Sequence, residues 1–172
     1  MMLTRRRCLA CAGALLLAGC ADRKDEAALA PAEFTGATSC ALDGMLLADY
    51  PGPKAQIHYA DAKEPEFLCD TVEMFSLLLR PEQVRKLRAV YTQDMGAADW
   101  DQPRGHWFDA KAGFYVVGSK RPGAMGPTIP GFRQQADAQK FAAQWGGKVV
   151  AFAEVTPQMA DLSGGAQQDT RM

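Results

Sequence analysis

The stretch Asp70-Thr71-Val72-Glu73-Met74-Phe75 sets the architecture of this chain, because it marks the start of a helix. Asp70 is a suitable N-cap, and Glu73 follows three residues later, which is the spacing of a capping box. The apolar residues that follow share one helical face, namely Val72, Phe75, Leu78 and Leu79. We predict a helix over residues 71–80, because Pro81 disfavours helical backbone in the residue before it.

Short apolar or alternating runs on either side of this helix predict strands. Residues 45–48 and 55–59 precede it, separated by the turn Tyr50-Pro51-Gly52-Pro53, and residues 87–92 follow it. The first half of the chain therefore has the predicted order strand–strand–helix–strand.

The second half shows the same order. Residues 107–110 and 113–118 are predicted to be paired strands, and residues 135–145 form an amphipathic helix that ends at Gly146-Gly147. Residues 149–153 give the last strand. In both halves a Phe and then an Asp precede or enter the helix: Phe67 and Asp70, Phe132 and Asp137.

This repetition predicts an α+β fold made of two related ββαβ units, over residues 38–96 and 97–157. One helix and a three-stranded sheet give too small a core to be stable alone, so we expect the units to pack together. Residues 158–172 are rich in Gly, Gln and Asp and predict a disordered tail.

The N-terminus has the features of an export signal. Arg5-Arg6-Arg7 precede an apolar run that is too short to span a bilayer, and Leu17-Ala18-Gly19-Cys20 matches a bacterial lipobox. We predict a lipoprotein signal peptide over residues 1–19, lipidation of Cys20 and a flexible tether over residues 20–37. A plain signal peptide is the alternative, and the arginines leave both the general and the twin-arginine export routes open. The protein would be periplasmic, and Ala21 favours the outer membrane.

Cleavage would leave two of the five cysteines free of lipid, Cys40 and Cys69. In an oxidising compartment these two could form a disulfide. Alternatively, Cys40-Ala41-Leu42-Asp43-Gly44-Met45 places a thiol and a thioether on one short loop. Such soft donors suit Cu(I) better than Zn(II), Mg(II) or Ca(II).

Met125 is the third candidate ligand. It lies in Gly123-Ala124-Met125-Gly126-Pro127, a segment that favours a loop over a buried helix or strand. An exposed methionine there would suit an interaction or metal site. The alternative reading makes Met45 a core residue, and Cys69 is expected to be buried or disulfide-bonded rather than a ligand.

The composition disfavours several other classes of protein. The formal charge of −1 predicts no attraction to nucleic acid. There are only two histidines, and they form no cluster, so a catalytic zinc site is not supported. The chain also lacks the Gly-x-Ser-x-Gly elbow of serine hydrolases and the Walker loop of nucleotide-binding proteins.

Several motifs together resemble the NosL family of nitrous oxide reductase accessory proteins. The motifs are Cys40-Ala-Leu-Asp-Gly-Met45, Pro51-Gly-Pro-Lys-Ala-Gln-Ile57, Asp70-Thr-Val-Glu-Met-Phe75, Tyr115-Val-Val-Gly118, Ala124-Met-Gly-Pro-Thr128 and Gly146-Gly147. The resemblance runs from about Thr38 to Thr156 and includes the lipobox.

The resemblance implies a membrane-tethered copper chaperone that binds one Cu(I) through Cys40, Met45 and Met125. It would deliver the metal, through a maturation ABC transporter complex, for assembly of the CuZ centre of nitrous oxide reductase. The implied fold is NosL/MerB-like, a pair of ββαβ units similar to the organomercurial lyase core. Many relatives carry a second cysteine where this chain has Asp43, so we expect one thiolate with thioethers and easier release of the metal.

Two rival functions remain open from the sequence. A cysteine-dependent lyase or redox protein would need both Cys40 and Cys69 free and close together. A purely structural lipoprotein would bury its sulfurs and leave Cys40 unreactive.

Overall fold

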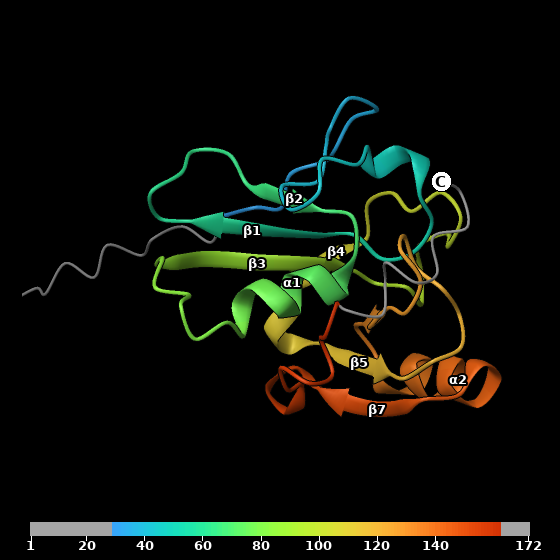
Figure 1. The fold of residues 1–172 in the computed structure, drawn as a ribbon. Coiled ribbons are helices and arrows are strands. Elements are labelled where there is room, and N and C mark those ends of the chain that lie inside the picture. The colour runs from blue at the N-terminus through green and yellow to red at the C-terminus, as the bar shows by residue number, and fades with distance from the viewer. Residues whose placement is uncertain (1–28, 163–172) are drawn as a thin grey trace, which may run out of the picture.

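The structure, a computed structural model, describes residues 29–162 as two small sheets and two helices (Figure 1). The strands are β1 (Ala55–Tyr59), β2 (Glu66–Leu68), β3 (Leu87–Gln93), β4 (Trp107–Asp109), β5 (Phe114–Val117), β6 (Gly131–Phe132) and β7 (Lys148–Ala151). The helices are α1 (Thr71–Leu78) and α2 (Gln135–Trp145). The predicted helices are confirmed, with α1 ending two residues earlier than expected.

The two sheets repeat one topology. The first has the strand order β2-β1-β3-β4 and the second has the order β6-β5-β7, and all pairs are antiparallel. The runs β1-β2-α1-β3 and β5-β6-α2-β7 therefore follow the same path. The prediction of an α+β fold with two related ββαβ units is confirmed. Phe67 and Phe132, which flagged the repeat, lie in the equivalent strands β2 and β6.

In the first unit one strand prediction is wrong, and one strand was not predicted. Residues 45–48 form no strand: Leu46 makes an isolated bridge with Ser39, and Leu47–Asp49 is a 3-10 turn. The apolar run reflects the burial of Leu47 in the core. The partner of β1 is instead β2, which is only three residues long and shows no readable alternation.

The predicted pairing of residues 107–110 with 113–118 is also wrong. A 3-10 turn, Ala110–Ala112, redirects the chain between them. As a result β4 joins the first sheet beside β3, while β5 pairs with β6 and β7 in the second sheet.

Helix α1 packs between the two sheets, and its buried side chains share a core with residues of both. The ring of Phe75 contacts Tyr115 of β5, with the ring centroids 4.8 Å apart. Successive residues of β5 then face different cores: Tyr115 belongs to the α1 core, and Val116 belongs to a second core beneath α2. In Figure 1 α1 lies in front of the first sheet, whereas α2 lies at the lower edge of the molecule beside β5 and β7.

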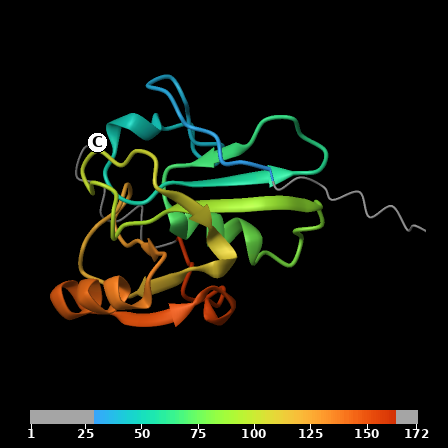
Figure 2. The same cartoon turned by 180° about the vertical axis from the view of Figure 1, so that it is seen from behind.

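The first described residues lie on the opposite face of the first sheet, as the view from behind shows (Figure 2). Both the N–H and the carbonyl of Ala32 hydrogen-bond the Gln56 side chain, and Phe34 is buried against Phe67 and Trp107. Ala32 and Phe34 therefore tie this segment to the first sheet, within the residues 20–37 that we expected to be a flexible tether.

The end of the described chain is packed as well. Ala160 is buried, and Met159 and Leu162 contact the main core, although residues 158–162 were expected to belong to a disordered tail. The predicted signal peptide, Cys20, residues 20–28 and residues 163–172 lie outside the described residues. None of the helices between residues 29 and 162 has the length and hydrophobicity that a membrane span requires.

Candidate metal site

The loop from Cys40 to Met45 closes on itself above β2. The N–H of Cys40 donates to the carbonyl of Met45 at 2.8 Å, and the N–H of Gly44 donates to the carbonyl of Cys40 at 3.0 Å. Asp43 shapes the turn, as its carboxylate accepts from the N–H of Met45 at 2.9 Å. Gly44 has φ +81°, which a residue with a side chain rarely adopts. The loop buries Cys40, half-buries Met45 and exposes Asp43.

The start of α1 brings a second cysteine and a carboxylate to this loop. Asp70 caps the helix through the N–H of Val72, and the capping box is complete. Its other half is Glu73, whose Oε2 accepts from the N–H of Cys69 at 3.1 Å and of Asp70 at 3.3 Å. The capping box therefore turns the buried carboxyl of Glu73 back towards Cys69.

Two thiols and two carboxylates meet at this point. The sulfurs of Cys40 and Cys69 each lie 3.3 Å from Glu73 Oε2, and the Cys69 sulfur lies 3.8 Å from Asp43 Oδ2. One ligand atom from each of the four residues falls within 4.8 Å of the others. Neither Cys40 nor Cys69 is in a disulfide. We call Cys40, Asp43, Cys69 and Glu73 the thiol–carboxylate cluster.

Among the described side chains, Glu73 Oε1 is one of few buried polar atoms with no hydrogen-bond partner. An unpartnered buried carboxylate oxygen is costly unless a cation or a proton satisfies it. This atom therefore marks the cluster as suited to a positive charge.

The cluster holds its protons unevenly. A hydrogen bond from the Cys69 thiol, aided by the backbone N–H groups of Cys69, Asp43 and Leu42, lowers the pKa of Cys40 to about 6. The same interaction and burial raise the pKa of Cys69. Burial and the neighbouring Cys40 thiolate raise the pKa of Glu73 to about 8. Near neutral pH the cluster therefore offers one thiolate, on Cys40.

A buried lysine supports the cluster from beneath. Lys54 has no exposed surface, and its ammonium donates to the carbonyls of Tyr50 at 2.9 Å, Pro51 at 3.0 Å and Cys69 at 3.0 Å. Burial lowers the pKa of Lys54, whereas Asp70 and the cluster act in the opposite direction. The ammonium fixes the backbone of Cys69 against the turn that precedes β1.

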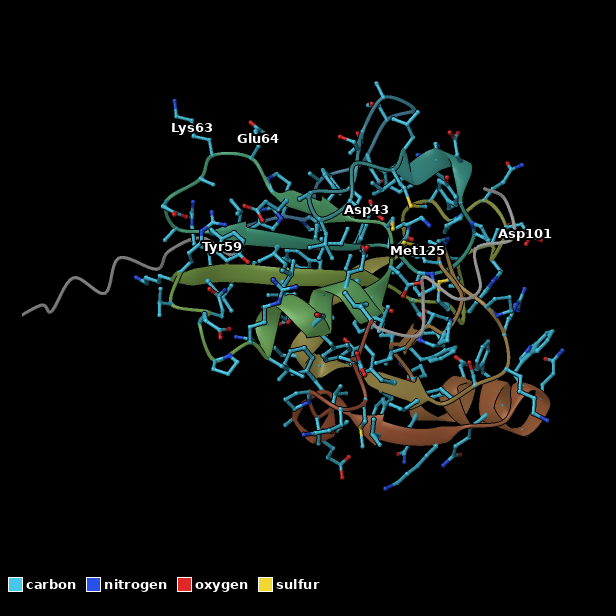
Figure 3. All side chains as sticks on the ribbon, viewed as in Figure 1. Asp43, Tyr59, Lys63, Glu64, Asp101 and Met125 are labelled. Atoms are coloured by element: carbon cyan, nitrogen blue, oxygen red, sulfur yellow. The ribbon has the colours of Figure 1, made fainter. Side chains whose placement is uncertain are left out.

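Met125 lies at the first turn of α1. It sits in a turn closed by the N–H of Gly123 and the carbonyl of Gly126 at 2.7 Å, and it borders a cavity of about 20 Å³ together with Val72 and Leu162. Met125 is half-buried. In the view of Figure 3, Met125 and Asp43 both lie away from the end of the sheet that carries Lys63 and Glu64.

The structure thus unites some predicted residues and adds others. Cys40 and Met45 share one loop as expected, and Met125 lies by the helix that carries Glu73, but the ligand roles of all three stay predictions. Cys69 and Glu73 were not predicted as site residues. The capping-box register gave a usable signal, since it directs Glu73 back towards the residue before Asp70.

Comparison with known proteins agrees with this geometry. The sequence profile of the NosL family matches residues 31–160, which is most of the chain. The chain belongs to the NosL family.

Relatives of this family member include two proteins named copper-binding lipoprotein NosL. The protein from Stutzerimonas stutzeri is 35% identical over 141 residues, covering 81% of this chain and 73% of the relative. The protein from Achromobacter cycloclastes is 36% identical over 162 residues, covering 92% and 84%. Among solved structures, the copper chaperone NosL from Shewanella denitrificans matches with a TM-score of 0.72 and 37% identity. That match covers 76% of this chain and 98% of that protein. The NosL fold predicted from the sequence is confirmed.

Proposed function

We propose that this chain is a copper chaperone, not an enzyme, which binds one Cu(I) and delivers it for assembly of the CuZ centre of nitrous oxide reductase. Two relatives carry the name copper-binding lipoprotein, and a structural neighbour is titled a copper chaperone. The observation that carries the proposal is the close approach of two free thiols, Cys40 and Cys69. Met45 lies on the same loop as Cys40, and the turn that carries Met125 is hydrogen-bonded to Asp70, the neighbour of Cys69.

The donor set suits a soft monovalent metal. The Cys40 thiolate supplies the charge that anchors Cu(I), and its lowered pKa keeps it ionised near neutral pH. The thioethers of Met45 and Met125 complete the shell and need no deprotonation. Asp43 and Glu73 are hard oxygen donors, so they serve the site better as charge and hydrogen-bond partners than as Cu(I) ligands.

Delivery would proceed by exchange of ligands at the surface. Met45 and Met125 are only half-buried, and Asp43 is exposed on the same loop as Cys40. A partner's sulfur can therefore approach the metal while Cys40 still holds it. We propose that the partner is a maturation ABC transporter complex, which passes copper to nitrous oxide reductase directly or through a further step.

The cellular context is part of the proposal. We propose that Cys20 is lipidated and anchors the protein at the periplasmic side of a membrane, and Ala21 favours the outer membrane. Both named relatives are lipoproteins. Cu(I) bound to the Cys40 sulfur would also keep that sulfur from forming a disulfide with the nearby Cys69 in that compartment.

A cysteine-dependent lyase or redox protein is the second candidate, because it needs two free and neighbouring thiols, which the cluster has. Such an enzyme also needs a pocket for its substrate. A cavity of about 480 Å³ lies between the end of α1 and residues 157–162, but none of the cluster residues lines it. This arrangement favours metal binding over chemistry on an organic substrate.

The decisive experiment is a Cu(I) titration of the full chain against a competing chelator. We expect one Cu(I) per chain and a loss of at least about a hundredfold in affinity for Cys40→Ser, because the thiolate is the only anion in the proposed shell. Met45→Leu and Met125→Leu should each weaken binding by less. Met95→Leu, in the separate α2 core, is the matched control and should change nothing.

The same titration tests the alternatives. Full affinity in Cys40→Ser would refute the proposed site. Thiol labelling distinguishes a chaperone from a cysteine-dependent enzyme. In a chaperone Cu(I) should protect Cys40 from alkylation, whereas labelling that is unchanged by Cu(I) would favour the enzyme.

A further inference from the structure

One buried carboxylate joins the turn that carries Met125 to the helix that carries Glu73. Asp70 is 1% exposed. Its Oδ1 accepts from the hydroxyl of Thr128 at 2.6 Å and from the N–H of Val72 at 3.0 Å, and its Oδ2 accepts from the N–H of Ala124 at 3.2 Å. The side chain that caps α1 therefore also holds both ends of the Met125 turn.

The contact between the two elements is close. A Cβ placed on Gly123 would lie 2.0 Å from Asp70 Oδ2 and 2.7 Å from the Cβ of Thr128, so only glycine fits there. Thr71, the first residue of α1, also bonds this segment, as its hydroxyl donates to the carbonyl of Ile129 at 2.6 Å. The turn can therefore occupy only a narrow range of positions against α1.

The metal-site residues lie directly on this contact. Cys69 is the neighbour of Asp70 in the chain, and Ala124 is the neighbour of Met125. The Cys69 backbone is itself fixed by Lys54, so the Asp70–Thr128 contact sets the place of the Met125 turn relative to a fixed thiol.

We propose that Asp70 and Thr128 form a latch that holds the Met125 thioether in position beside the two thiols. Thr128 is then a positioning residue, which acts on the metal only through Met125. The inference rests on the proposed function for the identity of the metal, Cu(I), but the position of Met125 can be measured without any metal.

Thr128→Val is the most specific variant, because valine keeps the shape of threonine and only replaces its hydroxyl with a methyl group. Asp70 would retain both of its backbone donors, so the helix cap survives. Thr128→Ser restores the hydroxyl and should restore the wild-type behaviour. Tyr115→Phe is the matched control, since it also removes a buried hydroxyl with a 2.6 Å hydrogen bond, to the carbonyl of Ala110.

The first measurement is the Cu(I) affinity of the full chain in a double-mutant cycle. Loss of a group that orients a metal ligand typically lowers affinity about tenfold or more, so we expect about a tenfold loss in Thr128→Val. In a Met125→Leu background the same change should alter affinity by no more than about twofold. An equal loss in both backgrounds would overturn the latch, because Thr128 would then act on the whole fold.

The second measurement uses the metal-free chain. With the methionine methyl groups labelled with ¹³C, the NMR chemical shift of the Met125 methyl group should move towards the value of a mobile methionine in Thr128→Val. The amide hydrogen of Ala124 should also exchange faster with solvent. Thr128→Ser and Tyr115→Phe should leave both signals as in the wild type. Unchanged signals in Thr128→Val would overturn the latch whatever the copper affinity. A wild-type chain that binds no Cu(I) would refute the proposed function, and these two signals would still decide whether the latch exists.

Discussion

The two ββαβ units share a strand order but use their helix N-termini differently. In the first unit Asp70 caps α1, and Glu73 completes the capping box and contacts both cysteines. In the second unit Gln134 occupies the N-cap of α2 without a side-chain hydrogen bond. Asp137, the counterpart suggested by the sequence, forms an ion pair with Lys140 at 2.9 Å on the surface.

The cores differ in the same way. Besides the cysteines, the first unit buries a lysine, an aspartate and a glutamate that are each no more than 1% exposed: Lys54, Asp70 and Glu73. Among the described residues, no Lys, Asp, Glu or His of the second unit is buried, and beneath α2 Phe141 stacks on Trp100. The first unit thus places buried charged groups near the thiols, while the second unit contributes the turn that carries Met125.

Removing the side chain of Asp70 should cause the largest loss of folding stability among the changes at the two helix N-termini. Asp70→Ala takes away the cap of α1 and leaves the Thr128 hydroxyl and the Lys54 ammonium in the core without their carboxylate neighbour. Leaving buried hydrogen-bond donors without their acceptor typically costs about 1–3 kcal/mol for each donor, so we expect a loss of about 3 kcal/mol or more. The free energy of unfolding of the metal-free protein in urea measures this loss. A loss below about 1 kcal/mol would mean that the two helix starts are energetically equivalent.

Glu73→Gln should change stability by less than Asp70→Ala and by more than Asp137→Ala, and its effect should depend on pH. The pKa of Glu73 is raised from 4.5 to about 8, so the folded chain binds this proton more tightly than the unfolded chain. Its stabilising effect is complete below pH 4.5 and is lost as the pH rises towards 8. Between pH 4.5 and 6 the metal-free wild type should lose roughly 2 kcal/mol relative to Glu73→Gln.

The window ends at pH 6 because Cys40 then acts in the opposite sense. Its pKa is lowered to about 6, so its contribution increases as the pH rises above that value. Urea unfolding at several pH values below 6 isolates Glu73. Glu82→Gln, at an exposed position, is the control and should keep the wild-type slope. Parallel slopes for the wild type and Glu73→Gln would show that the buried carboxyl does not hold an extra proton.

Asp137→Ala should have the smallest effect. The ion pair with Lys140 is exposed, with side-chain exposures of 32% and 78%, and such pairs contribute at most about 1 kcal/mol. Urea unfolding should show a change within about 0.5 kcal/mol, and Cu(I) affinity should not change. A large loss of stability here would reveal an unrecognised structural role for the second helix start.

The sequence was most informative about the helices and least informative about short strands. The capping box at Asp70 and the Gly146-Gly147 stop placed both helices, because these are local signals. Strands β2 and β6 have only three and two residues, and such runs are too short to show a period. Their existence depends on tertiary pairing with β1 and β5, which no local pattern encodes.

The site was predicted in part for a similar reason. Cys40 and Met45 share one loop, so their proximity follows from the sequence alone. Cys69 is separated from Cys40 by the whole of β1 and β2, and its sulfur reaches the cluster because β2 lies beneath the 40–45 loop, where the N–H of Ala41 donates to the carbonyl of Phe67. That contact spans the missed strand, so the second thiol could not be assigned in advance.

Strand β4 has a consequence for how the protein comes apart. It follows the first unit in sequence, yet it completes the first sheet through Thr92 and Phe108 before the chain enters the second sheet. Neither unit can unfold alone without breaking the hydrogen bonds between β3 and β4 or exposing the side chains of α1, which both units cover. We therefore expect a single calorimetric peak on heating, and chains cut between residues 97 and 106 should yield no separately stable fragment.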